Sequence, residues 1–365
     1  MNNLYGKGLV ILAFSKQYFL GANSRFGFHS LYNSFCKAED GGFLYVIKGG
    51  PGCGKSSFMK AIGSAAEDEG YECEYILCSG DPDSLDGLFI PELGVGYVDG
   101  TAPHTIDAAY PGCGGMYLDL GQYYHASALR QRLDEIMQLN KLYKGLYSCA
   151  YASIGAATAA MPRYIQSLWG EDELQKLEKK LQGLINREFG KRSFQSDVKE
   201  RFIDAVTSKG YIFLHDSISH SYERLITLDN KFGLGHHFLQ RLYEEALGRT
   251  SEIILCRDCL DPRLITAIMF PEISLALICS LDGREELSQC RHMRLDSLIP
   301  REKLSPMRRQ LRAGQHLWED SLALATTTLA DAKAMHDKIE AIYNPHVDFD
   351  GVYREAKRHI ELLFS

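Results

Sequence analysis

Apolar residues in the first third of the chain form short runs of strand length, separated by polar and glycine-rich segments. Three such runs, residues 42–48, 73–78 and 93–99, predict buried strands. The first run is followed by a glycine-rich loop and then by a helix-like stretch over residues 57–67. Strands that alternate with helices in this way predict a doubly wound α/β fold with a mainly parallel sheet.

Longer stretches of helical periodicity occupy the end of each half of the chain. From about residue 127 to residue 188 the pattern is helical, and it is broken near Pro162 and Gly170. Its amphipathic stripe consists of Leu133, Ile136, Met137, Leu139 and Leu142. Residues 308–343 show the same pattern, and a final helix is expected over residues 351–363. We expect a helical hairpin appended to each half, which covers a sheet edge, joins the two halves or closes over a substrate.

The second half of the sequence repeats features of the first half in the same order, with an offset that changes only slowly. The matched pairs are Phe19–Ala22 with Phe202–Ala205, Leu44–Ile47 with Leu225–Leu228, Asp81-Pro82 with Asp261-Pro262, Ile90–Leu93 with Phe270–Ile273, and Met116–Asp119 with Met293–Asp296. Several collinear matches indicate a tandem duplication. The sequence therefore predicts two domains of one fold, over residues 1–190 and 191–365.

A phosphate-binding loop is predicted directly after the first strand. The segment Gly49–Ser56 reads GGPGCGKS and fits the pattern G-x-x-x-x-G-K-S. Backbone N–H groups and a helix dipole converge there, while Lys55 would reach the β- and γ-phosphates and the Ser56 hydroxyl would ligate Mg²⁺. The predicted nucleotide-binding residues of the loop are Gly49, Gly50, Pro51, Gly52, Cys53, Gly54, Lys55, Ser56 and Ser57. We therefore expect a nucleoside triphosphate and Mg²⁺ as ligands.

Acidic residues after the second and third strands are candidates for chemistry beside this loop. Asp99 ends an apolar strand and is the expected second support for Mg²⁺. Asp83 and Asp86 follow the second strand, where they would orient an acceptor hydroxyl, although the same cluster also fits an exposed turn. His104 either contacts the γ-phosphate or caps its own loop. Together with Lys55, the three aspartates form the predicted catalytic set.

The corresponding loop of the second half has lost the phosphate-binding pattern. Asn230–His237 stands opposite Gly49–Ser56, with His236 in place of Lys55 and His237 in place of Ser56. A histidine pair that binds a metal is the alternative, but no third ligand is evident beside it. We expect a degenerate second loop and one nucleotide site.

Composition narrows the class of protein. The 365 residues are 45% hydrophobic and 24% charged, as in a globular chain with an ample core. A formal net charge of −7, without a basic block, argues against a nucleic-acid partner. The apolar run Gly8–Phe14 is too short for a membrane span and lacks a signal-peptide pattern, so we expect no membrane partner and a cytoplasmic protein. The ten cysteines are expected to be reduced, and the lone C-x-x-C at Cys256–Cys259 lacks the second pair of a zinc site.

Several runs together resemble a known family. GGPGCGKS, CSGDPDSLDG, IPEL and DGTAPH are similar to segments of tandem P-loop ATP-binding proteins from bacteria, which are described as ATPases or nucleotide-kinase-like proteins. The resemblance covers nearly the whole chain and implies the P-loop fold and ATP. In that family the second half often keeps its P-loop, so the degenerate loop over residues 230–237 is a departure.

Three functions fit these observations. The first is a slow Mg-ATPase whose second half is structural or regulatory. The second is a small-molecule or nucleotide kinase, in which Asp83 or Asp86 orients the acceptor. The third is a nucleotide-gated module whose helices move when ATP binds, with a protein partner or a second copy of the chain as its target. No glutamate follows Asp99, so a carboxylate that activates water has to come from elsewhere in the chain.

Overall fold

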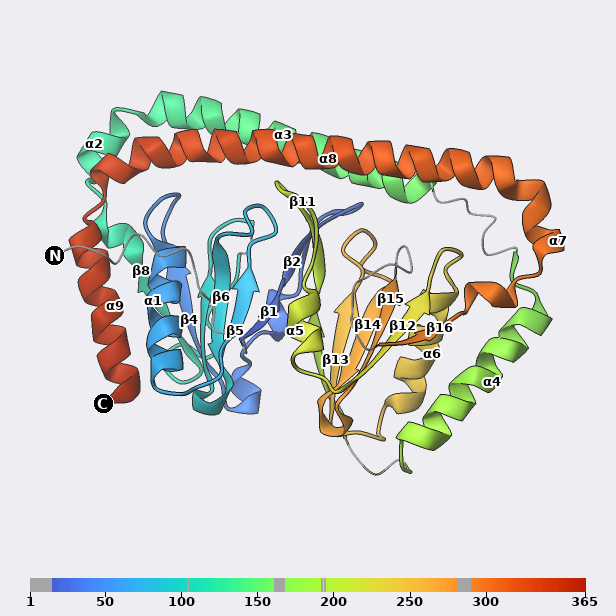
Figure 1. Ribbon diagram of the computed structural model, residues 1–365. Helices are drawn as coiled ribbons and strands as arrows, with labels where there is room; N and C mark the ends of the chain where they lie inside the picture. The colour runs from blue at the N-terminus through green and yellow to red at the C-terminus, as the bar shows by residue number, and fades with distance from the viewer. Residues whose placement is uncertain (1–14, 104, 161–167, 192, 194, 281–289) are drawn as a thin grey trace.

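Two six-stranded sheets lie side by side beneath a pair of long helices (Figure 1). This computed structural model describes residues 15–103, 105–160, 168–191, 193, 195–280 and 290–365. The first sheet has, in spatial order, β1 (Lys16–Tyr18), β5 (Glu74–Leu77), β6 (Leu85–Ile90), β7 (Val95–Asp99), β4 (Phe43–Lys48) and β8 (Gly115–Asp119). The second has β9 (Asp197–Arg201), β13 (Glu252–Arg257), β14 (Ile265–Phe270), β15 (Leu275–Ser280), β12 (Arg224–Asp229) and β16 (Arg291–Met293).

The two sheets share one topology. In the first, β6 runs antiparallel to β5 and β7, and the remaining pairings are parallel. In the second, β14 runs antiparallel to β13 and β15, and the remaining pairings are parallel. The predicted α/β class with mostly parallel strands is confirmed, and the strand order repeats between halves as a duplication requires. The strand β6 was not predicted, because Asp86 and Gly87 interrupt its apolar pattern.

Two β-hairpins join the halves at the centre of the molecule. They are formed by β2 (Gly21–Ser24) with β3 (Gly27–Ser30), and by β10 (Asp204–Thr207) with β11 (Gly210–Phe213). Just before them, Phe19 and Phe202 form an antiparallel bridge in which each N–H donates to the other's carbonyl oxygen over 2.9 Å. Both phenylalanines are fully buried, and one hydrophobic core extends through this junction from the first half into the second.

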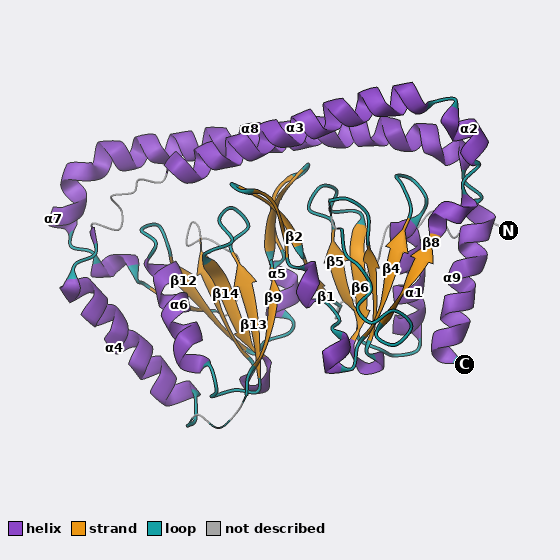
Figure 2. Ribbon diagram, turned by 180° about the vertical axis from the view of Figure 1, so that it is seen from behind, coloured by secondary structure: helices purple, strands orange, loops and turns teal. Residues whose placement is uncertain are grey.

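The C-terminal helices of each half pack on elements of the other half. The helix α3 (Leu133–Ala160) packs along α8 (Arg308–Tyr343), and the two run in opposite directions above both sheets (Figures 1 and 2). The next helix of each half then covers the other half: α4 (Glu171–Glu188) packs on α6 (Leu234–Ala246), and α9 (Phe349–Phe364) packs on α1 (Lys55–Asp68).

The predicted hairpin within each half is therefore wrong. The apolar face of α4, with Leu177, Leu181 and Leu184, is buried in the core of the second sheet. Helical periodicity identifies a face that must be covered, but it does not identify the element that covers it. Short helices complete the fold: α2 (Ala126–Arg130), α5 (His215–Ser219) and α7 (Arg301–Leu304).

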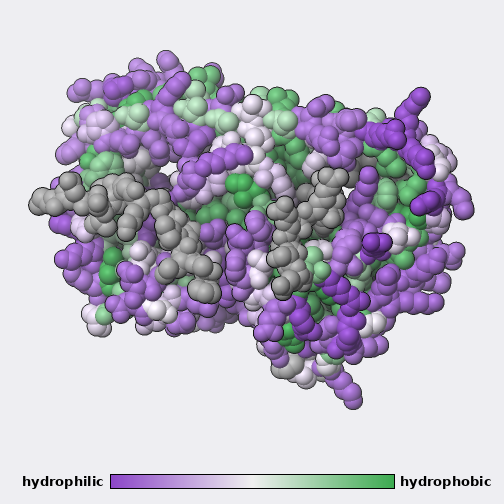
Figure 3. All heavy atoms as spheres, in the orientation of Figure 1, coloured by the Kyte–Doolittle hydropathy of each residue, from purple (hydrophilic) through white to green (hydrophobic). Residues whose placement is uncertain are grey.

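The face of the molecule drawn in Figure 3 is largely hydrophilic, with hydrophobic side chains gathered near its centre. Among the described residues, no helix has the length and apolar character of a membrane span.

Candidate functional site

The glycine-rich loop joins the end of β4 to the start of α1. Residues 49–54 form the turn, and Gly52 and Gly54 adopt left-handed backbone conformations with φ of 69° and 88°. These conformations are strained for residues with a Cβ atom, so glycine is required there. Gly54 is the N-cap of α1, and Lys55 and Ser56 are its first residues. The sequence thus folds locally as a strand, a glycine loop and a helix N-terminus.

Lys55 and Asp99 meet at the centre of this loop. The Lys55 ammonium donates to the carbonyl oxygens of Gly49 (2.7 Å) and Gly50 (2.9 Å), and it lies 3.5 Å from Asp99 Oδ2. Their side chains are only 12% and 14% exposed, so this pair is largely shielded from solvent. The other oxygen of Asp99 accepts hydrogen bonds from the backbone N–H (2.8 Å) and hydroxyl (2.5 Å) of Thr101. A partly buried cation and carboxylate therefore stand together at the N-terminus of α1.

The remaining loop residues divide between the site and the surface. The Ser56 hydroxyl accepts a hydrogen bond from the backbone N–H of Leu85 (2.9 Å), which fixes the start of α1 against β6. Cys53 is buried, and burial raises the pKa of its thiol although Lys55 opposes the shift. Ser57 is exposed on α1. His104, which was predicted either to contact the γ-phosphate or to cap its own loop, lies outside the described residues.

The two acidic residues after β5 have different environments. Asp86 lies on β6 beside Gly87, whose register partner is Val98, so Asp86 is adjacent to Asp99 on the neighbouring strand. It is 5% exposed and accepts a hydrogen bond from the Tyr32 hydroxyl (3.1 Å). Burial and the adjacent Asp86 raise the pKa of Tyr32 well above its usual value.

Asp83, by contrast, points out of the first half. Its side chain is 73% exposed and forms an ion pair with Lys209, which lies between β10 and β11 of the second half. Its backbone carbonyl accepts a hydrogen bond from Lys60 (2.5 Å). The structure thus brings Lys55, Ser56, Asp99 and Asp86 to one edge of the sheet, and it places Asp83 in a contact between halves.

The C-terminal part of the chain covers the outside of the loop, which sequence reasoning missed. Tyr124 of the first half also contacts the loop, and its hydroxyl donates to the carbonyl oxygen of Pro51 (3.3 Å). In the amide orientation that satisfies its neighbours, Asn344 donates to the carbonyl oxygen of Gly52 (3.1 Å). A Cβ atom at Gly52 would lie 2.3 Å from the Asn344 side chain. No local signal could reveal a contact between residues so far apart in the chain.

The loop of the second half is closed by its own protein groups. The backbone N–H groups of Lys231 and Phe232 donate to the carboxylate of Asp296 (3.1 and 3.4 Å). Trp169 donates to the carbonyl oxygen of Phe232 (2.9 Å) and packs against Gly233. A carboxylate therefore occupies the N–H groups that a phosphate would need.

The residue correspondence between the two loops differs by two positions from the prediction. Gly54 and Gly233 are the left-handed N-cap residues of α1 and α6, with φ of 88° and 76°. Leu234, the first residue of α6, therefore stands opposite Lys55, the first residue of α1. The second loop is two residues shorter, because Gly54 follows Lys48 by six positions and Gly233 follows Asp229 by four. Leu234 cannot supply a cation.

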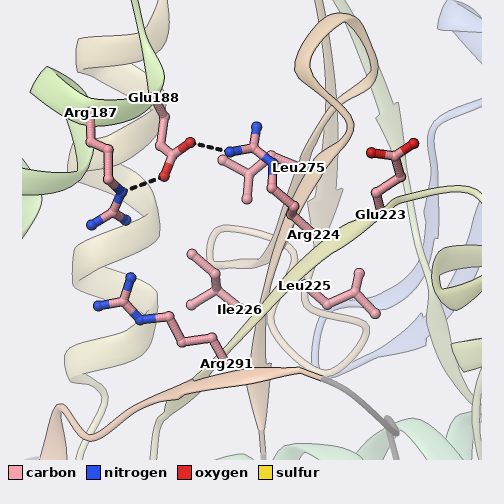
Figure 4. A pocket seen from close by; sticks show the side chains of 8 residues that line it. All are labelled: Arg187, Glu188, Glu223, Arg224, Leu225, Ile226, Leu275 and Arg291. Carbon is pink, nitrogen blue, oxygen red and sulfur yellow. Dashed lines mark hydrogen bonds and ion pairs between the residues drawn. The ribbon is translucent and has the colours of Figure 1, made fainter.

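A cavity of about 230 Å³ lies elsewhere, at the amino ends of β12 and β15 (Figure 4). Glu188 of α4 forms ion pairs there with Arg187 (2.6 Å) and Arg224. Burial opposes ionisation of Glu188, but these two arginines hold its pKa below the usual value. The loops follow the carboxyl ends of the strands, so this cavity is separate from the candidate site and its ion pairs attach α4 to the second sheet.

Comparison of the chain with protein-family models, with curated proteins and with solved structures gives no match. Function is therefore inferred from the geometry of the site itself.

Proposed function

We propose that the protein binds Mg-ATP at one P-loop site in its first half and hydrolyses it slowly. One observation carries the proposal: the Lys55 ammonium lies between the loop carbonyls of Gly49 and Gly50 and the Asp99 carboxylate, at the N-terminus of α1. A triphosphate matches this arrangement, because the ammonium can exchange the two carbonyl oxygens for phosphate oxygens.

The donor set also fits Mg²⁺. The Ser56 hydroxyl and the Asp99 carboxylate are oxygen ligands, which this ion prefers, and they lie on the helix and strand that flank the loop. When bound, Mg²⁺ would neutralise charge on the β- and γ-phosphates. The chain's own contribution is to orient the phosphates with backbone N–H groups and to hold Lys55 where charge accumulates.

The second half has a structural or regulatory role in this proposal. The Asp296 carboxylate already accepts hydrogen bonds from two backbone N–H groups of the second loop, and Leu234 stands where the first half has Lys55. Its helices α8 and α9 nevertheless reach the first half and contact the active loop and α1. These contacts also support the nucleotide-gated alternative, because a change in the loop would act directly on the end of α8.

A kinase is the second candidate function, and Asp86 is the observation that favours it. This buried carboxylate lies beside Asp99, whereas Asp83 is exposed and paired with Lys209. In a kinase, Asp86 would orient the hydroxyl of a small-molecule acceptor.

One experiment separates these functions. Calorimetric titration with Mg-ATP should give one nucleotide per chain. Incubation with γ-labelled ATP, with and without a metabolite extract, should then place the label in inorganic phosphate for an ATPase or in a metabolite for a kinase. Nucleotide binding without labelled phosphate or a labelled metabolite would favour the nucleotide-gated module. A chain that binds no nucleotide would refute the proposal.

A further inference from the structure

One face at the C-terminal end of α8 lies against the glycine-rich loop of the proposed nucleotide site. Lys333, His336, Glu340 and Asn344 are three or four residues apart, so they share this face. At one end, the Lys333 ammonium lies 3.4 Å from a carboxylate oxygen of Asp81, in the turn after β5. At the other end, Asn344 rests on Gly52. The two residues between these contacts therefore lie over the edge of the sheet where Lys55 and Asp99 meet.

His336 and Glu340 form a pair at this position. His336 Nδ1 is 3.8 Å from Glu340 Oε1, and the Cα atom of Glu340 is 3.5 Å from the place where a side chain at Gly52 would begin. Burial is the main cause that lowers the pKa of His336. The Lys333 and Lys55 ammonium groups act in the same direction, while Glu340 and Asp337 oppose them.

The helix α3 also contacts this pair of side chains, and solvent reaches part of it. The His336 ring lies 5.7 Å from the ring of Tyr143 on α3, which encloses it from the opposite helix. The Glu340 side chain is 34% exposed, so water can reach the carboxylate. An accessible carboxylate with a fixed neighbour is suited to orienting a water molecule.

Among the described residues of the first half, no such carboxylate lies next to Asp99, the proposed metal-binding aspartate. Asp99 is followed by Gly100, and the adjacent Asp86 is buried and bonded to Tyr32. We propose that Glu340, oriented by His336, supplies this group from the second half and positions the water that attacks the γ-phosphate. This inference rests on the proposed ATPase function and extends it to the residue that directs hydrolysis.

The step balances without another reactant. The water oxygen forms a bond to the γ-phosphorus, and the bond from that phosphorus to the β–γ bridging oxygen breaks with its electron pair leaving on ADP. One proton of the water passes to the Glu340 carboxylate and then to solvent, so the products are ADP and inorganic phosphate. Because α8 belongs to the second half, both halves are needed for one active site. This requirement gives the degenerate half a role in catalysis.

The test compares Glu340→Gln with Glu319→Gln in the full-length chain. Glu319 is a matched control, because it lies on the same helix and pairs with a histidine, His316, but is 52% exposed and faces no loop residue in any described contact. Glu340→Gln should bind Mg-ATP within about threefold of the wild type and release phosphate about 100-fold more slowly in single turnover. Glu319→Gln should match the wild type in both measurements.

Two further variants test the assigned roles. Glu340→Asp keeps a carboxylate and should recover part of the lost rate. His336→Gln should bind ATP normally but flatten the pH dependence of phosphate release, which a purely structural role would not change. Unchanged hydrolysis by Glu340→Gln, or a wild-type chain that binds ATP and releases no phosphate, would overturn the inference. Absence of ATP binding by the wild type would instead overturn the proposed function, and the inference with it.

Discussion

Replacement of Lys55 by alanine tests the nucleotide site most directly. Lys55 makes two hydrogen bonds to loop carbonyls and one ion pair with Asp99, at 12% exposure. On nucleotide binding, the carbonyl contacts would be exchanged for charge-assisted bonds to phosphate oxygens, each worth about 1.5–3 kcal/mol. Since the carbonyl bonds are given up, we expect a net loss of about 2–3 kcal/mol in Lys55→Ala, which weakens the Kd for Mg-ATP by about 30- to 150-fold.

The fold should tolerate this change. Asp99 keeps both hydrogen bonds from Thr101, so the carboxylate is not left without partners. We expect the free energy of unfolding to fall by no more than about 1–2 kcal/mol. Urea unfolding without nucleotide measures this change in the free energy of unfolding separately from the change in nucleotide affinity.

Calorimetry on the wild type, Lys55→Ala and Lys60→Ala completes the test. Lys60 lies on the same helix, but its ammonium bonds to the backbone carbonyl of Asp83 and not to the loop, so its removal should leave the Kd within about twofold. A folded Lys55→Ala variant that binds Mg-ATP as tightly as the wild type would refute the assignment of this loop.

Three further predictions follow from the other acids and from the second loop. Asp99→Asn should slow basal phosphate release by about 100-fold, because the metal loses a charged ligand, whereas Asp83→Asn should change the rate less than twofold. Equal effects of the two substitutions in a phosphate-release assay would contradict the assignment of Asp99 to the site and of Asp83 to the contact between the halves. His236→Ala should leave one nucleotide per chain and an unchanged Kd by calorimetry, and loss of a second bound nucleotide would show that the second loop is active. Burial, reinforced by Asp258, raises the pKa of Asp204 from 3.8 to about 7, so this group favours the fold below about pH 4 and loses that contribution as the pH rises to about 7. Asp204→Asn should therefore become progressively more stable relative to the wild type as the pH rises from about 4 to about 7 in urea unfolding, and a pH-independent difference would disprove the shift.

The sequence alone predicts those features of the fold that depend on residues close together in the chain. The α/β class, the strand β4, the glycine turn and the start of α1 follow from short-range patterns, because strand length and glycine conformation are local properties. The repeated strand order follows from collinear matches between the halves. Asp99 was expected beside the loop as a support for Mg²⁺, because it ends an apolar strand, and the structure places it 3.5 Å from the Lys55 ammonium.

Tertiary structure alone decides which distant segments complete the site. The exchange of α4 and α9 between halves and the placement of His336, Glu340 and Asn344 beside the loop depend on how apolar helix faces are covered. A periodic pattern shows that a face must be buried, but many faces in one chain have similar composition. The choice among them is made by the shape and packing of the whole fold, because close packing is satisfied only when all helices are placed together.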